Sequence, residues 1–232
     1  MDDGRRPGEA GATELTDQFS TPISPSDAER LRALIDRRRM TRNFVSEPAV
    51  DSLGIDQVME WCELARRAPS AGHSQGLHFL VRSDVARTLE DLGSLDWWTR
   101  RQPGVLDAAT VVVVLVDPSS YTDRYGQPDK EGPGLERIEN WRIPYWLTDA
   151  GMAIQNLLLI IEAERHGALF AGVFRDPRSA LSGWGVPENL ECVGLIFVGV
   201  RHPGDRPTGS SVSRPWRPRD EVVHRETWTR QG

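Results

Sequence analysis

The chain has 232 residues, of which 38% are hydrophobic and 27% are charged, a composition typical of a globular protein with its own core. Its formal net charge of −6 argues against general nucleic-acid binding, because binding to a phosphate backbone needs a basic face. The longest apolar runs are far shorter than the roughly 20 residues of a membrane span, and no apolar signal segment opens the chain. We therefore expect a cytoplasmic protein without nucleic-acid or membrane partners.

The N-terminal quarter of the chain predicts a tail followed by two helices. Residues 1–23 show no hydrophobic periodicity and predict a disordered tail, which leaves residues 24–232 as a single domain. Ser26 is expected to cap a first helix, which continues at helical spacing into a cluster of arginines. A second helix is predicted over residues 50–68, where the following proline ends it.

The arginine cluster at the end of the first helix is dense. Arg37, Arg38, Arg39 and Arg42 place four guanidinium groups within six residues. Arginine donates in a rigid fork that matches phosphate oxygens, so the cluster favours an anion site. An exposed charged face is the alternative interpretation, and the cluster alone leaves both open.

The middle of the chain predicts a loop, two strands and a long excursion. Residues 68–76 are small and polar, as in loops that approach a ligand closely, and they lead into a strand over 77–82. A short helix is predicted over 85–92. The valine run within 108–116 predicts a central strand that is buried on both faces. Residues 117–134 predict a long loop, of the kind that covers or forms a binding site.

The second half of the chain contains the most apolar helix. The pattern predicts it over Asp149–Glu164, with Asp149 near its N-cap, either at the centre of the fold or at a subunit interface. A strand over 168–174, a short helix over 176–181 and a buried strand over 192–200 follow. About four strands alternate with helices, so the sequence predicts the α+β class.

Chemical motifs are sparse. There is no GxGxxG or Walker loop, no serine elbow and no metal-ligand spacing, so phosphate binding would depend on arginine. A second arginine group lies near the C-terminus, at Arg214, Arg217 and Arg219. Several aromatic side chains favour core packing, with an acceptor pocket as the alternative: Trp97, Trp98, Trp141, Tyr145 and Trp146.

Two blocks in the first half of the chain match a known pattern. Arg38–Phe44 reads Arg-Arg-Met-Thr-Arg-Asn-Phe, and Ala68–Gln75 reads Ala-Pro-Ser-Ala-Gly-His-Ser-Gln. They resemble the first two signatures of the flavin-dependent nitroreductases, a family that includes iodotyrosine deiodinase. Met40 stands where that family has serine, and Gly76-Leu77 stands where it usually has Pro-Trp.

Two later blocks continue the resemblance in the same order. Asp149–Asn156, followed by Phe170-Ala171-Gly172, is similar to the family's Asp-x-Gly-x-x-x-Gln-Asn-Leu helix and the strand after it. Arg217–Val223 is similar to its basic segment before a Glu-Val-Val tail. The resemblance implies a nitroreductase-like fold with a mostly antiparallel sheet of four to five strands, flanked by helices and built on a long apolar central helix.

The resemblance also implies a cofactor and a reaction. NADH or NADPH would reduce bound FMN, which would then reduce an electron-poor small molecule such as a nitroaromatic compound or a quinone. The family forms homodimers with the flavin at the subunit interface. The alternatives are a flavin-sequestering protein with little turnover, and a reductive dehalogenase or deazaflavin-dependent reductase of the same fold.

Motif by motif, the resemblance assigns cofactor contacts and no catalytic acid or base. Arginines would bind the FMN phosphate and ribityl chain, and Met40 would offer only its backbone. His73 would face the pyrimidine edge, while Ala171 and Gly172 would donate backbone N–H groups to flavin N5 and O4. The expected set is Arg38, Arg39, Met40, Arg42, Pro69, Ser70, Ala71, His73, Gln75, Phe170, Ala171, Gly172, Arg214 and Arg217.

Overall fold

The computed structural model describes residues 24–46, 53–130, 132, 134–208 and 210–228, and the chain divides by spatial proximity into units 1–38 and 39–232. The predicted tail and the start of the predicted second helix lie outside the described residues. The expectation of a single domain stays a prediction.

The described part of the first unit is helix α2, Pro25–Arg37. The sequence predicted Ser26 as the N-cap, but the cap is Ser24. The Ser24 hydroxyl accepts from the Asp27 N–H at 3.2 Å. The reason is Pro25, which lacks an N–H and has a φ suited to the first helical position, so the cap is the residue before it, two residues before the predicted one. The helix ends at the arginine cluster, as predicted.

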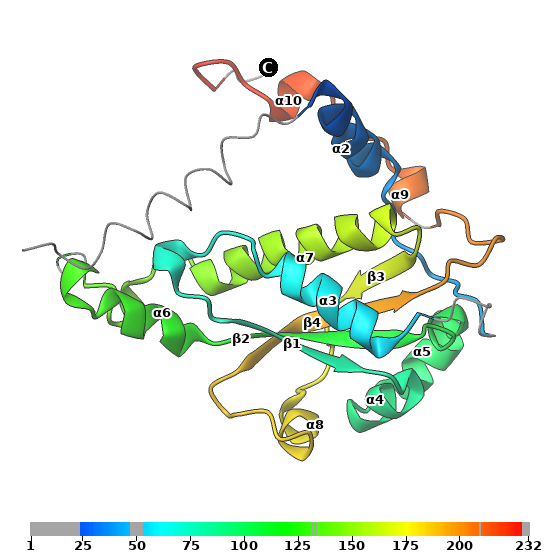
Figure 1. The fold of residues 1–232 in the computed structure, drawn as a ribbon, viewed down its shortest axis with the longest axis horizontal. Coiled ribbons are helices and arrows are strands. Elements are labelled where there is room, and N and C mark those ends of the chain that lie inside the picture. The colour runs from blue at the N-terminus through cyan, green and yellow to red at the C-terminus, as the bar shows by residue number, and fades with distance from the viewer. Residues whose placement is uncertain (1–23, 47–52, 131, 133, 209, 229–232) are drawn as a thin grey trace, which may run out of the picture. The chain divides into compact units, whose positions relative to one another are not determined.

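The second unit is built on one sheet of four strands, in the order β1-β2-β4-β3 (Figure 1). The strands are β1 Leu77–Arg82, β2 Thr110–Val116, β3 Gly167–Ala171 and β4 Glu191–Gly199. All neighbouring pairs are antiparallel. Every residue of β2 is buried, which confirms the prediction of a central strand covered on both faces.

Helices cover both faces of this sheet, and alternate residues of β2 face the two layers. Val112 and Val114 pack in the core shared with α3, Ile55–Ala65, and α7, Tyr145–Ala163. Val111, Val113 and Leu115 pack in the opposite core. That core also contains residues of α4 Val85–Asp91, α5 Leu95–Arg101 and α8 Arg178–Gly183. The fold is thus the predicted α+β arrangement of a four-stranded antiparallel sheet flanked by helices, with a long apolar helix on one face.

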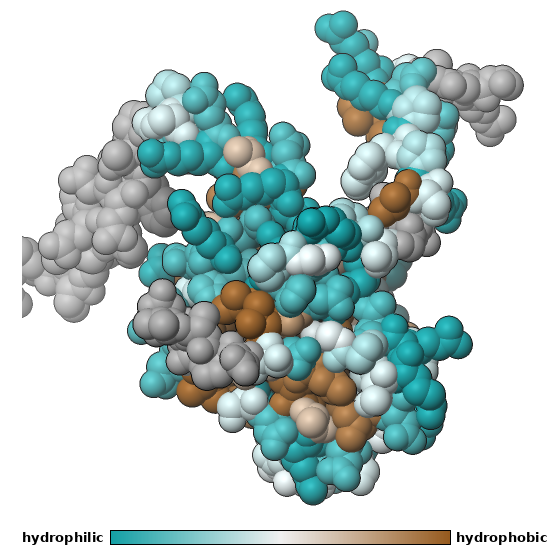
Figure 2. All heavy atoms as spheres, turned by 90° about the vertical axis from the view of Figure 1, so that its right-hand side faces the viewer, coloured by the Kyte–Doolittle hydropathy of each residue, from teal (hydrophilic) through white to brown (hydrophobic). Residues whose placement is uncertain are grey.

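The remaining elements are short helices. Their bounds are α6 Pro118–Tyr125, α9 Ser210–Ser213 and α10 Arg219–Val222, with 3-10 turns η1 Ala71–His73, η2 Pro103–Val105, η3 Pro128–Lys130 and η4 Ile138–Asn140. Hydrophilic side chains predominate on the face shown in Figure 2, with apolar atoms in separate patches between them. Among the described residues, no helix combines the length and the hydrophobicity needed to cross a membrane.

Two predicted boundaries were wrong in ways that matter for the site. Helix α7 begins at Tyr145, so Asp149 lies inside the helix and is buried, not at the N-cap. The predicted loop over 117–134 contains α6, which begins with an Asp-Pro pair: Asp117 accepts from the Ser119 N–H at 2.9 Å, and Pro118 takes the first helical position. The segment 117–134, which we call the excursion, therefore contains a helix that contacts the 68–76 loop.

Candidate active site

The segment that follows α2, residues 39–44, is called the arginine turn here, and a buried carboxylate organises it. Asp205 accepts a hydrogen bond from the Arg39 guanidinium, and the Arg42 and Asn43 backbone N–H groups donate to it at 3.1 and 3.0 Å. Burial by itself would raise the pKa of Asp205, but these hydrogen bonds outweigh burial and hold its pKa below the usual value. The Arg39 guanidinium is therefore engaged inside the protein.

A second buried network holds the same turn against α7. Arg201 donates from Nε to the Thr41 hydroxyl at 3.0 Å and from Nη2 to Glu162 at 2.7 Å. The Thr41 N–H donates to the Ala168 carbonyl of β3 at 2.8 Å. Thr41 and Glu162 are both buried, so the position of the turn is set by the folded core.

Met40, the departure from the family's serine, uses its side chain inside the protein. Its backbone bridges to Ala168, and its sulfur accepts from the Phe170 N–H at 3.4 Å. The side chain packs against both core clusters. Nearby, Gly172 is exposed, and a Cβ added there would meet no atom within 4 Å, so this position is open to a ligand.

Two arginines of the cluster have different surroundings from Arg39. The Arg38 backbone N–H closes α2 by donating to Leu34 at 3.0 Å, while its Nη1 is buried and has no hydrogen-bond partner among the described residues. A buried donor without an acceptor is costly, and an anionic group would satisfy it. Arg42 is half-buried and contacts Asp205 through its backbone.

The 68–76 loop adopts an unusual backbone. Gly72, His73 and Gln75 have φ values of 61°, 58° and 55°. Left-handed backbone costs a residue with a Cβ roughly 1–2 kcal/mol, so His73 and Gln75 need support from their surroundings. Within the loop, the Gln75 N–H donates to the Ser70 hydroxyl at 3.2 Å.

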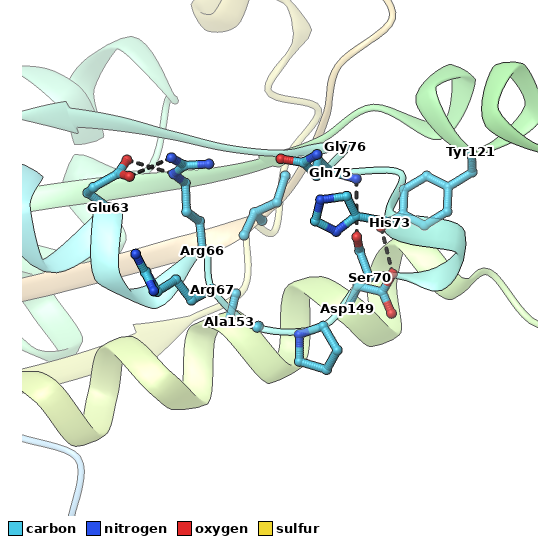
Figure 3. Close-up of a pocket in the computed structure, with 13 residues that line it drawn as sticks. Glu63, Arg66, Arg67, Ser70, His73, Gln75, Gly76, Tyr121, Asp149 and Ala153 are labelled. Carbon is cyan, nitrogen blue, oxygen red and sulfur yellow. Dashed lines mark hydrogen bonds and ion pairs between the residues drawn. The ribbon is translucent and has the colours of Figure 1, made fainter. Parts of the chain in front are cut away.

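The main support comes from Asp149 on α7. Its Oδ2 accepts from the Ala71 N–H at 2.8 Å. It also accepts from the Tyr121 hydroxyl of α6 at 2.8 Å (Figure 3). Burial raises the pKa of Tyr121, and the adjacent Asp149 carboxylate raises it further, so the hydroxyl stays protonated and continues to donate at neutral pH.

A pocket of about 320 Å³ opens beside this loop. Pro69, Ser70, His73 and Gln75, four of the predicted cofactor contacts, line it. Figure 3 shows Arg66 and Arg67 at the C-terminal end of α3, Asp149 on α7 and Tyr121 on α6 around the same space. The pocket offers imidazole, amide, hydroxyl and guanidinium groups, which suit a ligand with several polar edges.

The other predicted contacts are not in this pocket. Arg39, Met40 and Arg42 belong to the arginine turn, which meets β3 at Gly167 and Ala168, and only the Met40 sulfur reaches the Phe170 N–H among these three side chains of the described chain. Arg214 and Arg217 are exposed on the C-terminal segment, where Arg217 pairs with Glu221 at 3.0 Å. The predicted set therefore falls into three groups along the described chain.

Sequence reasoning missed the buried anchors of the site, Asp149, Tyr121 and Asp205, and the pocket arginines Arg66 and Arg67. One available signal was the single acidic side chain among apolar residues at the start of the central helix. Within the described ranges, no group of three or more His, Cys, Asp or Glu side chains is arranged to hold a metal ion.

Comparisons with known proteins agree on one family. Residues 35–200 match the model of the Nitroreductase family. A protein of Archaeoglobus fulgidus with the provisional name NADH dehydrogenase/NAD(P)H nitroreductase is 25% identical over 203 residues, which cover 86% of this chain and 99% of that protein.

Solved structures show the same fold at low sequence identity. A provisionally assigned nitroreductase of Bacillus subtilis superposes with a TM-score of 0.65 at 19% identity, covering 85% of this chain and 99% of its own. A nitroreductase-like protein of Streptococcus mutans gives 0.63 at 16% identity, covering 86% and 100%.

Proposed function

Because this chain belongs to the nitroreductase family, we propose that it is an FMN-dependent oxidoreductase that transfers hydride from NADH or NADPH to an electron-poor acceptor such as a nitroaromatic compound or a quinone. The observation that carries the proposal is the pocket beside the 68–76 loop. Pro69, Ser70, His73 and Gln75, which the second family motif assigns to the flavin, line one cavity.

The groups present fit FMN. Arg38 has a buried guanidinium nitrogen that finds no acceptor within the described part of the chain, which suits a phosphate. We assign the phosphate to Arg38 and Arg42, with Arg214 or Arg217 from the C-terminal segment. Arg39 is assigned a different role, as the anchor of the turn, because Asp205 engages its guanidinium.

The other side of the ligand would be held by the 68–76 loop. Ser70, His73 and Gln75 would bind the polar edge of the flavin, and the open position at Gly172 would let the backbone approach it. When bound, FMN would supply the hydride chemistry, which flavins carry out and amino-acid side chains do not. The protein would then contribute binding and orientation.

The sheet separates the two halves of this site within one chain. Leu80, Val113, Leu195 and Ala171 lie in one row across the four strands, so Ala171 is three inter-strand spacings, roughly 14 Å, from the β1 edge. The 68–76 loop lies beyond Leu77, farther along that edge. We propose a homodimer in which the loop of one subunit and the arginine turn of the other bind the same flavin.

Anaerobic reduction tests the function directly. FMN-loaded protein is mixed with NADH or NADPH, and flavin absorbance is followed before and after a nitroaromatic or quinone acceptor is added. We expect bleaching by at least one nucleotide and recovery on addition of the acceptor. Flavin that binds but is not bleached by either nucleotide would indicate a flavin-sequestering protein, and failure to bind FMN would contradict the proposal.

A further inference from the structure

Helix α6 contacts the 68–76 loop directly, at the residue where the backbone turns left-handed. Arg124 donates from Nε to the Gly72 carbonyl at 2.8 Å. The Tyr125 ring lies against the same glycine, since a Cβ at Gly72 would be 2.7 Å from Tyr125 Cε2. One turn earlier, Tyr121 binds the Asp149 carboxylate that also holds the Ala71 N–H. The helix therefore reaches two consecutive residues of the loop, one of them through Asp149.

Arg124 is itself held in place. Its two terminal nitrogens donate to the two Asp129 carboxylate oxygens at 2.8 and 2.7 Å, and Nη1 also donates to Gln127 at 3.1 Å. The Arg124 side chain is 23% exposed, and a bidentate pair fixes the plane of its guanidinium. Its Nε is thus oriented toward Gly72 before any ligand binds.

Helix α6, which carries Arg124, packs together with the start of α7 around one indole ring. Trp141 contacts Tyr121, Tyr125, Tyr145 and Trp146, with ring centroids 5.0 to 6.1 Å apart. Its Nε1 donates to the Leu135 carbonyl at 2.7 Å. Such edge-to-face packing fixes the position of α6.

We propose that α6 is a clamp that holds the 68–76 loop in its left-handed shape, and that Arg124 is the positioning residue of this clamp. The loop displays Ser70, His73 and Gln75 to the pocket, and their arrangement depends on the strained backbone at 72–75. The inference rests on the proposed function only for the identity of the ligand, FMN.

Hydrogen exchange of the flavin-free protein tests the clamp. The amides of Ala71, His73, Ser74 and Gln75 all donate hydrogen bonds, so each reports opening of the loop. Loss of a charged hydrogen bond typically costs about 1.5–3 kcal/mol, so Arg124→Gln should speed their exchange about tenfold or more. The matched control is Arg137→Gln, an exposed arginine between α6 and α7 that pairs with Glu139; it should leave these amides unchanged.

FMN titration of the same variants separates the clamp from the ligand. Faster exchange together with weaker FMN binding in Arg124→Gln supports both ideas. Faster exchange with unchanged FMN affinity supports the clamp and contradicts the assignment of the loop to the flavin. Unchanged exchange overturns the clamp, whatever the affinity.

Two further variants keep the test decisive if Arg124→Gln folds poorly. Asp129→Asn leaves Arg124 in place but weakens its bidentate anchor, and it should give a smaller acceleration in the same amides. Gln75→Asn keeps the amide and adopts left-handed backbone more readily, so adding it to Asp129→Asn should partly restore slow exchange. A double variant that exchanges as fast as Asp129→Asn alone would contradict the role of backbone strain.

Discussion

The arginine turn is held by two buried carboxylates that pair with arginines. The strained 68–76 loop is held by a buried carboxylate that binds a tyrosine hydroxyl and by an arginine of α6. Asp205 and Glu162 hold the turn through Arg39 and Arg201. The loop depends on Asp149 and on Arg124 of α6. Both segments carry predicted FMN contacts, so the difference shows that two parts of one proposed site can be preorganised by different means.

The comparison also distinguishes residues that could contact a bound molecule from residues that hold other parts of the site in place. Arg39 looks like a phosphate ligand in the sequence, yet its guanidinium binds Asp205. Asp149 looks like a helix cap in the sequence, yet it holds the 68–76 loop. A charged residue in a family motif can therefore support the site instead of contacting the ligand.

The largest expected effect is the loss of the carboxylate under the arginine turn. Asp205→Asn should lower the free energy of unfolding by about 2–4 kcal/mol, because it removes the charge that pairs with Arg39 in a buried setting. Urea unfolding at neutral pH measures this loss. Glu139→Gln, which alters an exposed pair, is the control and should change stability by less than about 1 kcal/mol.

The same carboxylate predicts a pH dependence. The pKa of Asp205 is lower in the folded protein than the roughly 3.9 of an unfolded aspartate, so its contribution is present above that value and is lost as pH falls through the folded pKa. The difference in unfolding free energy between wild type and Asp205→Asn should therefore become smaller as the pH falls. A gap that stays constant down to the acid transition would contradict the assignment.

Met40→Ser tests whether the departure from the family motif matters for packing or for the ligand. The change removes the sulfur that accepts from Phe170 and contacts with both cores, so unfolding should become easier by about 1–3 kcal/mol. FMN affinity should change by less than about tenfold, since a neutral hydrogen bond contributes about 1 kcal/mol. A large gain in affinity without loss of stability would show that Met40 faces the ligand instead.

The smallest expected effect concerns the support of the loop by Tyr121. Tyr121→Phe keeps the ring but leaves Asp149 with one donor fewer, which should cost about 1–2 kcal/mol of stability. The pKa of Tyr121 is higher in the folded wild-type protein than in the unfolded chain. The contribution of this hydrogen bond to stability is therefore fully present below about pH 10 and is lost as pH rises through the folded pKa. Near-ultraviolet titration should show one of the three tyrosines resisting ionisation, and that signal should vanish in the variant.

Sequence patterns located most of the fold, for clear physical reasons. The valine run of β2 and the apolar face of α7 are strong local signals, and both elements lie where they were predicted, apart from their ends. The position of Asp149 was missed because α7 begins four residues earlier, without a side-chain cap to mark its start. The α6 helix was missed because Gly, Pro and Asp residues around it resemble a loop.

The anchors of the site were hidden because they act across long stretches of sequence. Asp205 meets the arginine turn from 166 residues beyond Arg39, and Asp149 meets Ala71 from 78 residues away. No local pattern encodes such contacts. Motif resemblance found the residues that display groups to the pocket, and only the structure found those that hold them.

Equilibrium titration with FMN, comparing wild type with Arg38→Ala and Arg37→Ala, tests the central claim most directly. Arg37 is an exposed neighbour in the last turn of α2, whereas Arg38 has the buried donor without an acceptor. We predict stoichiometric binding by wild type, near-normal binding by Arg37→Ala, and affinity about tenfold to a hundredfold weaker in Arg38→Ala. Equal affinity in all three proteins would contradict the phosphate assignment, and no binding by wild type would contradict the proposed function itself.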